Sequence, residues 1–196
     1  MKLAVIIGAT REGRQTPKQA KWVVNSAKEV EGIEAELIDL KDYPMPFFNE
    51  PISPRYNPNR EIDPAVKKWL DKIEEFEAYI FVTPEYTHSI PGVLKNALDY
   101  ITWEVQKKPA AVISHGANGG ARAATDLKEI LSESRTAVIP STSALAISGM
   151  SELIDEEGNL DEKSKANPYG PQSALTGLLS DLKWYADALT PAREKA

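Results

Sequence analysis

The chain has no cysteine and only two histidines among its 196 residues. Without cysteine it can form no disulfide, no cysteine-based zinc site, no iron–sulfur cluster and no thiol nucleophile. Two histidines leave little material for a histidine-built metal site, so we expect no metal site. No apolar run approaches the roughly 18 residues of a membrane span. The apolar stretch Leu3–Ile7 is also too short for a signal peptide, and we therefore expect an intracellular, cytoplasmic protein.

The charge is predominantly acidic, with 29 acidic against 23 basic residues and a formal net charge of −6. This balance argues against nucleic-acid binding, which needs a basic face, but leaves room for one basic pocket. A hydrophobic fraction of 42% is too high for a disordered chain. The length fits one domain with its own core, and we expect residues 1–196 to form it.

Short apolar runs alternate with amphipathic stretches along the whole chain. The predicted strands are Leu3–Ile7, Ala35–Leu40, Ala78–Thr83, Ala110–Ser114 and Ala137–Ile139, the last with a continuation through Ala144–Ile147. The predicted helices follow Pro17, begin at the Asp63-Pro64 pair, and cover Leu94–Ile101, Leu127–Leu131 and Leu175–Leu189. Such alternation predicts an α/β fold with helices on both faces of a parallel sheet. Five strands suit a flavodoxin-like, doubly wound sheet of order 2-1-3-4-5.

Two long segments fall outside this alternation. Lys41–Ile62 contains five prolines and is interpreted as a stiff connector. Gly149–Pro171 is polar and acidic and is interpreted as a solvated flap. Since long loops inside compact domains are commonly functional or mobile, either segment is also a candidate for contacts with ligands or partners.

An open parallel sheet binds ligands beyond the carboxyl ends of its strands, where the strand order reverses. In the predicted sheet these positions follow Ile7, Thr83 and Ser114. The first segment, Gly8–Pro17, joins a strand to a helix N-terminus, a setting that favours anions. Its donors, which suit a phosphate, are Thr10, Arg11, Arg14 and Thr16. The alternative is a basic surface turn without a ligand.

Other phosphate-binding motifs do not match this segment. The spacing Gly8-x-x-x-x-Gly13 is that of a P-loop, but a P-loop continues with Lys-Ser/Thr, and here Arg14-Gln15-Thr16 follows. The third strand ends in Thr83 rather than in a carboxylate that would hold Mg²⁺. The Gly-x-Gly-x-x-Gly pattern of a Rossmann fold is absent as well. A nucleoside triphosphatase is therefore disfavoured.

The second and third segments suit a flat ring. Prolines fix both ends of Thr83–Gly92, which also contains Tyr86 and His88. Ser114–Arg122 contains three glycines, which let a backbone approach a ligand closely. The Ser114-His115 pair is weak support for a serine hydrolase, because neighbours on a strand point to opposite faces and no Gly-x-Ser-x-Gly elbow is present.

Together the three segments resemble the NADPH-dependent FMN reductase family, a flavodoxin-like group that includes quinone, azo-dye and chromate reductases. The first loop, Gly8-Ala9-Thr10-Arg11, has Ala9 where the family usually has Ser. The central motif covers Pro84–Asp99, with Thr87 where Asn is usual. The third loop supplies Gly116, Gly119, Gly120 and Arg122. The similarity extends over residues 1 to about 147 and is weak beyond them.

The resemblance implies an oxidoreductase that transfers hydride from NADPH or NADH to FMN and then passes electrons to a small acceptor. Quinones, azo or nitro compounds, metal oxyanions and flavins all remain possible acceptors. The cofactor carries this chemistry, so no catalytic side chain is named, and His88 is the candidate for shaping the substrate face. The predicted FMN phosphate contacts are Thr10, Arg11, Arg14, Gln15 and Thr16. The predicted ring contacts are Pro84, Glu85, Tyr86, Thr87, His88, Ser114, His115 and Gly116.

The resemblance also implies a homodimer or homotetramer, with Lys95–Glu104 and the long loops as candidate contacts. Two other functions are compatible with the fold. A flavodoxin-type carrier would bind FMN without accepting hydride, although such carriers typically lack arginines in the phosphate loop. A receiver-type signalling domain would need acidic residues after the first and third strands, where this chain has Gly8-Ala9-Thr10 and Thr83-Pro84.

Overall fold

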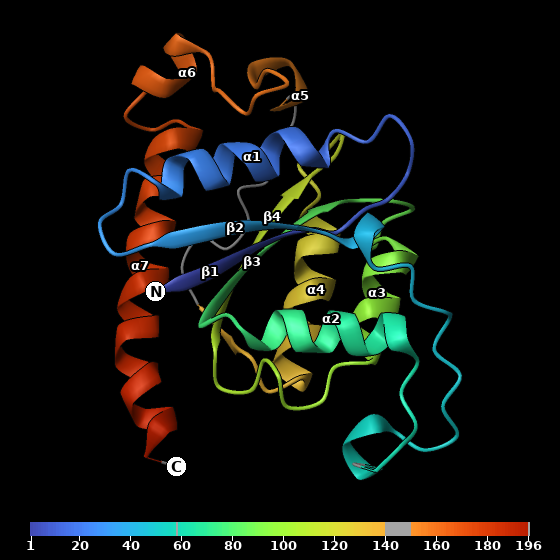
Figure 1. Ribbon diagram of the computed structural model, residues 1–196. Coiled ribbons are helices and arrows are strands. Elements are labelled where there is room, and N and C mark those ends of the chain that lie inside the picture. The colour runs from blue at the N-terminus through green and yellow to red at the C-terminus, as the bar shows by residue number, and fades with distance from the viewer. Residues whose placement is uncertain (58, 140–149, 196) are drawn as a thin grey trace.

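The computed structural model describes residues 1–57, 59–139 and 150–195, and it contains a five-stranded parallel sheet of order β2-β1-β3-β4-β5 (Figure 1). The strands are β1 (Lys2–Ile7), β2 (Glu34–Asp39), β3 (Ala78–Pro84), β4 (Pro109–His115) and β5 (Ala137–Val138). The predicted fold class and strand order are confirmed, and each strand ends within one residue of its predicted bounds. The predicted continuation Ala144–Ile147 lies outside the described residues.

Helices cover both faces of this sheet. They are α1 (Thr16–Ala27), α2 (Pro64–Glu74), α3 (Gly92–Asp99), α4 (Ala121–Glu133), α5 (Met150–Leu153), α6 (Glu162–Ala166) and α7 (Pro171–Glu194). Figure 1 shows α1 and α7 on one face, and α2, α3 and α4 on the other. The predicted start of α2 is confirmed, because the Asp63 carboxylate accepts a 2.8 Å hydrogen bond from the Ala65 N–H. No helix in the described ranges combines the length and apolarity needed to cross a membrane.

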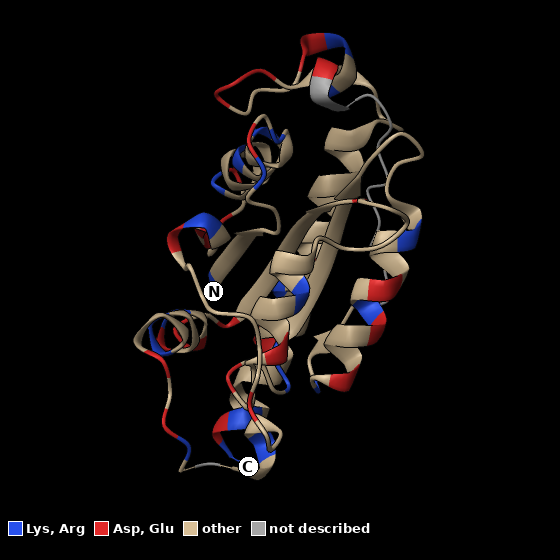
Figure 2. Ribbon diagram, turned by 90° about the vertical axis from the view of Figure 1, so that its right-hand side faces the viewer, with Lys and Arg blue, Asp and Glu red and all other residues tan. Residues whose placement is uncertain are grey.

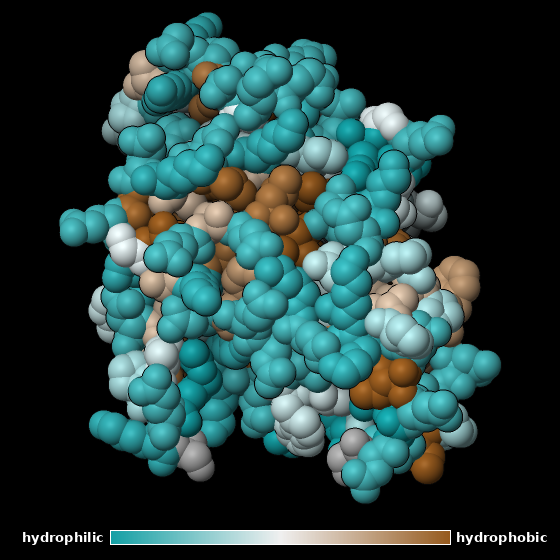
Figure 3. All heavy atoms as spheres, in the orientation of Figure 1, coloured by the Kyte–Doolittle hydropathy of each residue, from teal (hydrophilic) through white to brown (hydrophobic). Residues whose placement is uncertain are grey.

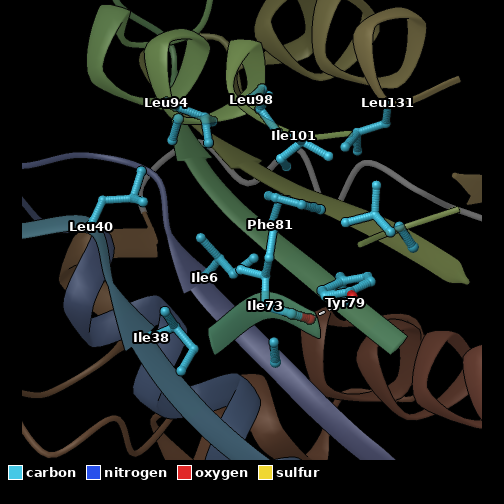
Figure 4. Close-up of a cluster of buried hydrophobic side chains, with 14 of the residues drawn as sticks. Ile6, Ile38, Leu40, Ile73, Tyr79, Phe81, Leu94, Leu98, Ile101 and Leu131 are labelled. Carbon is cyan, nitrogen blue, oxygen red and sulfur yellow. Dashed lines mark hydrogen bonds between the residues drawn. The ribbon is translucent and has the colours of Figure 1, made fainter. Parts of the chain in front are cut away.

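Each face of the sheet has its own apolar core. Beneath α2, α3 and α4 the side chains of Ile6, Phe81 and Leu94 converge, as Figure 4 shows. Buried aromatic groups there keep their polar atoms paired: the Tyr79 hydroxyl donates to the Ile73 carbonyl at 2.7 Å, and the Trp69 indole N–H donates to the Ala97 carbonyl at 3.0 Å. The second core lies beneath α1 and α7. These cores fix the strands whose carboxyl ends carry the three candidate segments.

Charged and apolar residues alternate along the edge strand β2. Glu34 and Glu36 are exposed, while Ala35 and Leu37 are half-buried against the second core. A band of apolar residues is visible below α1, in the region of β2 (Figure 3). Charged residues on such an edge oppose pairing with a strand of another molecule.

Hydrogen bonds attach the Lys41–Ile62 connector to α3, and an ion pair joins two of its own residues. It contains two short 3-10 helices, η1 (Leu40–Asp42) and η2 (Pro54–Tyr56). The Asn96 amide accepts a 2.8 Å hydrogen bond from the Phe48 N–H and donates another of 2.8 Å to the Pro46 carbonyl. An ion pair of 3.0 Å joins Arg60 to Glu50. These contacts attach the described part of the segment to α3, and its stiffness stays a prediction.

The interpretation of Gly149–Pro171 as a solvated flap is correct in part for the residues that the structure describes: most of Glu152–Pro171 is exposed, but the segment is attached to the core. Ile154 and Leu160 are 3% and 6% exposed and belong to the second core. The acidic turn between them is held against α1, because the Lys21 ammonium donates to the Glu156 carbonyl at 2.7 Å. The acidic residues of this region gather at the top of the molecule in Figure 2. Ile154 and Leu160, together with the Lys21 hydrogen bond, anchor the segment. Two isolated apolar residues in a polar sequence do not predict such an anchor.

Candidate functional site

Three segments extend from the carboxyl ends of neighbouring strands, as the predicted topology requires. We call them the first loop (Gly8–Gln15, after β1), the hairpin (Glu85–Ser89, after β3) and the glycine turn (Gly116–Gly120, after β4). The strand pairs β1·β3 and β3·β4 are adjacent in the sheet, which brings the three segments to one edge.

Three contacts join the predicted segments Gly8–Pro17, Thr83–Gly92 and Ser114–Arg122 directly. The Thr16 hydroxyl, in the first turn of α1, lies 3.0 Å from Nε2 of His115 at the end of β4. The Glu85 N–H donates a 2.8 Å hydrogen bond to the His115 carbonyl. The Arg11 guanidinium lies 5.2 Å from the centroid of the Tyr86 ring, a cation–π distance. The structure therefore brings together residues from all three predicted segments.

The first loop ends at an uncapped helix N-terminus. The residue before α1, Gln15, makes no side-chain cap, and its amide donates instead to the Gly13 carbonyl at 3.3 Å. The first turn of α1 contains no acidic residue. Within the described residues, the backbone N–H groups of Arg11 and Gly13 donate to no protein acceptor. The uncapped N–H groups and the helix dipole make the electrostatic potential at this end of the site favourable to an anion.

Arg14 forms an ion pair with a residue that the sequence did not indicate. Its guanidinium forms a 2.5 Å ion pair with Asp39, the last residue of β2, and also donates to the Ala9 carbonyl. Asp39 ends β2 in register with Ile7, which ends β1 just before the first loop, so the parallel topology was a usable signal. Lys18 likewise pairs with Glu156 at 2.7 Å. Arg11 has no carboxylate partner among the described residues, which leaves its charge available to a ligand.

The hairpin has an unusual backbone. Thr87 and His88 both adopt left-handed conformations, with φ of 49° and 66°, and both side chains are exposed. Tyr86 and Ser89 exchange two hydrogen bonds, of 2.9 and 3.1 Å, across them. This is the two-residue hairpin turn that Asn and Gly normally occupy. The turn places backbone groups and the Tyr86 ring at the edge of the site.

The glycine turn packs tightly on the end of β4. The Ser114 hydroxyl is buried and donates a 2.9 Å hydrogen bond to the Gly119 carbonyl, which closes the turn. A Cβ on Gly116 would lie 3.3 Å from the Cβ of Glu85. Because the Ser114 hydroxyl bonds the turn and the His115 ring bonds Thr16, the two side chains do not form a nucleophile–base pair, which agrees with the weak sequence support for a hydrolase.

Burial lowers the pKa of His115 from 6.5 to about 4. The ring is therefore neutral at physiological pH and contacts Thr16 as a neutral partner. It contributes no positive charge to an anion site. In the described part of the chain, no three His, Asp or Glu side chains gather in a way that would hold a metal ion.

Comparison with known proteins agrees with this arrangement. Residues 1–149 match the family described as NADPH-dependent FMN reductase. An NAD(P)H-dependent FMN reductase of Schizosaccharomyces pombe is 34% identical over 146 residues, which cover 74% of this chain and 73% of that protein. A quinone reductase of Pseudomonas putida is 29% identical over 170 residues, covering 83% and 86%.

Solved structures extend the likeness to nearly the whole chain. FerB of Paracoccus denitrificans, a flavoenzyme NAD(P)H:(acceptor) oxidoreductase, aligns with a TM-score of 0.73 and 27% identity over 96% of this chain and 98% of that one. An archaeal flavodoxin aligns with a TM-score of 0.53 at 13% identity, which shows a common fold alone. The chain thus belongs to the NADPH-dependent FMN reductase family and is an oxidoreductase that works with NAD(P)H and FMN.

Proposed function

We propose that this chain binds FMN across the first loop, the hairpin and the glycine turn, and that it passes electrons from NAD(P)H to a small acceptor there. The observation that carries the proposal is the convergence of the three segments through the Thr16–His115, Glu85–His115 and Arg11–Tyr86 contacts. The N-terminus of α1, which favours an anion, and the hairpin, with its exposed backbone, lie at the same edge of the sheet. They suit the phosphate and the ring of a flavin nucleotide.

At the phosphate end, we assign binding to Thr10, Arg11, Gln15 and Thr16 together with the free N–H groups of the loop. Arg14 has a different role in this proposal. Its ion pair with Asp39 and its bond to the Ala9 carbonyl hold the loop in shape, so it positions the other donors. The charge facing the phosphate then comes chiefly from Arg11 and the N-terminus of α1.

At the ring end, we assign contacts to Pro84, to Tyr86–His88 and to Ser114–Gly116, through backbone groups and the faces of flat side chains. FMN, when bound, supplies the redox chemistry by accepting hydride from NAD(P)H and giving electrons to the acceptor. The residues of the chain bind and orient it. His88 is exposed beside this surface and is our candidate for shaping the acceptor face. A His88→Ala enzyme with unchanged turnover and acceptor range would remove that role.

The experiment that tests this function is anaerobic mixing of the FMN-loaded protein with NADPH and, separately, with NADH. We expect loss of the oxidised flavin absorbance, followed by its return when a quinone, an azo dye, chromate or free flavin is added. The acceptor that restores it fastest identifies the substrate class. A flavoprotein that neither nucleotide reduces would instead be an electron carrier.

We expect Arg11→Ala to weaken FMN binding by about 10- to 100-fold, because a charge-assisted hydrogen bond contributes about 1.5–3 kcal/mol. Fluorescence titration of the apoprotein measures the affinity. Riboflavin is the matched control ligand, since it has the same ring without the phosphate, and its affinity should change little. Equal losses for FMN and riboflavin would show that Arg11 does not bind the phosphate.

We also propose that the chain forms a homo-oligomer through the face made by α3 and α4. A groove of about 660 Å³ runs between these helices and is lined by Lys95, Leu98, Asp99, Glu129, Ile130, Ser132, Glu133 and Ser134. Trp103 is 49% exposed, and the guanidinium groups of Arg55 and Arg135 lie over its ring, 5.7 and 5.6 Å from the ring centroid. A two-fold interface pairs one patch with its own copy, and apolar residues with charges of both signs supply groups that attract each other across such an axis.

Light scattering tests the oligomer. We expect twice or four times the chain mass of 21.6 kDa, and a shift towards that mass itself in Ile130→Glu, which puts a charge into the groove. A wild-type protein that stays at the mass of one chain would contradict the proposal.

We place the enzyme in the cytoplasm. The absence of cysteine and the dependence on NAD(P)H both suit a reducing compartment. Cell fractionation followed by detection with an antibody tests the location.

A further inference from the structure

The hairpin is held in a conformation that needs support from outside it. Thr87 and His88 both have positive φ, and a non-glycine residue in that region costs about 1–3 kcal/mol. Thr87 is β-branched, which makes the left-handed conformation less favourable still. Such a backbone persists only where the surrounding contacts determine it. The contacts that do so involve residues on both flanks of the turn.

On the near flank, Glu85 is bound to the N-terminus of α4. Its carboxylate accepts hydrogen bonds from the N–H groups of Arg122, at 3.1 Å, and Ala123, at 3.4 Å. The residue before α4 is Gly120, which has no side chain for capping, and the first turn contains no acidic residue. Glu85 therefore caps a helix that belongs to another segment. The Glu85 side chain is only 14% exposed. The Arg122 guanidinium lies 3.6 Å from its carboxylate.

On the far flank, Ser89 is bound to the same helix. Its hydroxyl donates a 2.7 Å hydrogen bond to the Asp126 carboxylate in the second turn of α4. The same helix follows directly on the glycine turn, which the Ser114 hydroxyl closes. The hairpin and the glycine turn are thus attached to one rigid element, and the two walls of the site are fixed relative to each other.

We infer that Glu85 and Asp126 are positioning residues that lock the hairpin to α4 and so set the shape of the ring-binding surface. The inference rests on the proposed function for the identity of the ring. It also changes the role of Glu85, which the sequence resemblance gives as a flavin contact. Both carboxylates act through hydrogen-bond acceptance at α4 and Ser89, and neither needs to touch the flavin.

The variants that test the inference are Glu85→Ala and Asp126→Ala, with Glu85→Gln and Asp126→Asn as the conservative replacements. The amides of Gln and Asn keep an oxygen that can accept the same hydrogen bonds. Asp181→Ala is the matched control, since Asp181 is an exposed carboxylate on α7, away from the site.

The first readout is amide hydrogen exchange in the protein without flavin. We expect the Tyr86 and Ser89 N–H groups to exchange about tenfold faster in both alanine variants. Exchange in Glu85→Gln, Asp126→Asn and Asp181→Ala should stay within about twofold of wild type. Unchanged exchange in the alanine variants would overturn the inference without touching the proposed function, because no flavin is present.

The second readout is flavin affinity. We expect the alanine variants to lose about tenfold in affinity for FMN and for riboflavin alike, since the disturbed surface binds the ring. Glu85→Gln and Asp126→Asn should keep an affinity close to that of the wild type. Loss of flavin affinity in Glu85→Gln equal to that in Glu85→Ala would show instead a direct contact of the carboxylate with the ligand. A wild-type protein that binds neither flavin would refute the proposed function, while the exchange result would still decide the anchoring role.

Discussion

Gly120→Ala is expected to lower the free energy of unfolding by about 3 kcal/mol and to abolish FMN binding. Gly120 has a φ of +75°, and a Cβ there would lie 2.8 Å from the carbonyl oxygen and 2.9 Å from the nitrogen of His115. A left-handed alanine costs about 1–2 kcal/mol, and overpacking against an immobile group adds about 1–3 kcal/mol. The obstructing atoms are backbone at the end of β4, so the glycine turn must move.

Denaturant unfolding measures the stability change, and Gly177→Ala is its matched control. Gly177 lies within α7, away from its ends, and is exposed to solvent. A Cβ there would meet nothing within 4 Å. That substitution should stabilise the protein by about 0.5–1 kcal/mol, because glycine is unfavourable inside a helix. A Gly120→Ala protein as stable as wild type, with normal flavin affinity, would show that the close packing of the glycine turn on β4 is wrong.

Removal of His115 is expected to flatten the acid side of the stability profile. Burial lowers the pKa of His115 to about 4 in the folded chain, whereas the unfolded value is near 6.5. Between these values the unfolded state binds a proton that the folded state does not. Stability therefore falls as the pH falls from 6.5 towards 4, by about 3 kcal/mol at about 1.4 kcal/mol per pKa unit. In His115→Gln this component is absent.

Urea unfolding at a series of pH values measures the effect as the difference between wild type and variant. The chain has only one other histidine, His88, which is exposed in the hairpin. His88→Gln is the comparison variant, because it removes the other histidine and leaves the buried His115 in place. A slope that disappears with His88 and persists without His115 would mean that the buried histidine has been assigned wrongly.

The fold was predictable because its signals are local. Each strand is a short apolar run, each helix shows an amphipathic stripe, and alternation of the two dictates a parallel sheet. The Asp63-Pro64 start of α2 was also visible, since cap and first turn are adjacent in sequence. The packing of Ile154–Leu160 against α1 was not visible, because Ile154 and Leu160 are isolated apolar residues in a polar segment.

The meeting of three segments at one edge was predictable from topology, but the role of each side chain within them was not. The sequence offered Arg14 and Glu85 as direct ligand contacts, and both turn to protein partners, Asp39 and the N-terminus of α4. These partners lie 25 and 37 residues away along the chain. The strand order places Asp39 beside the first loop, but neither periodicity nor a motif specifies that the Arg14 and Glu85 side chains bind these partners.

The most direct test of the account is an amide chemical-shift titration of the isotope-labelled protein with FMN. We expect one saturable site, with the largest shift changes confined to the N–H groups of the first loop, the hairpin and the glycine turn. Titration with riboflavin should leave the first loop nearly unchanged while the other two segments still respond. Shifts centred elsewhere, for instance in the groove between α3 and α4, or no shifts at all, would contradict it.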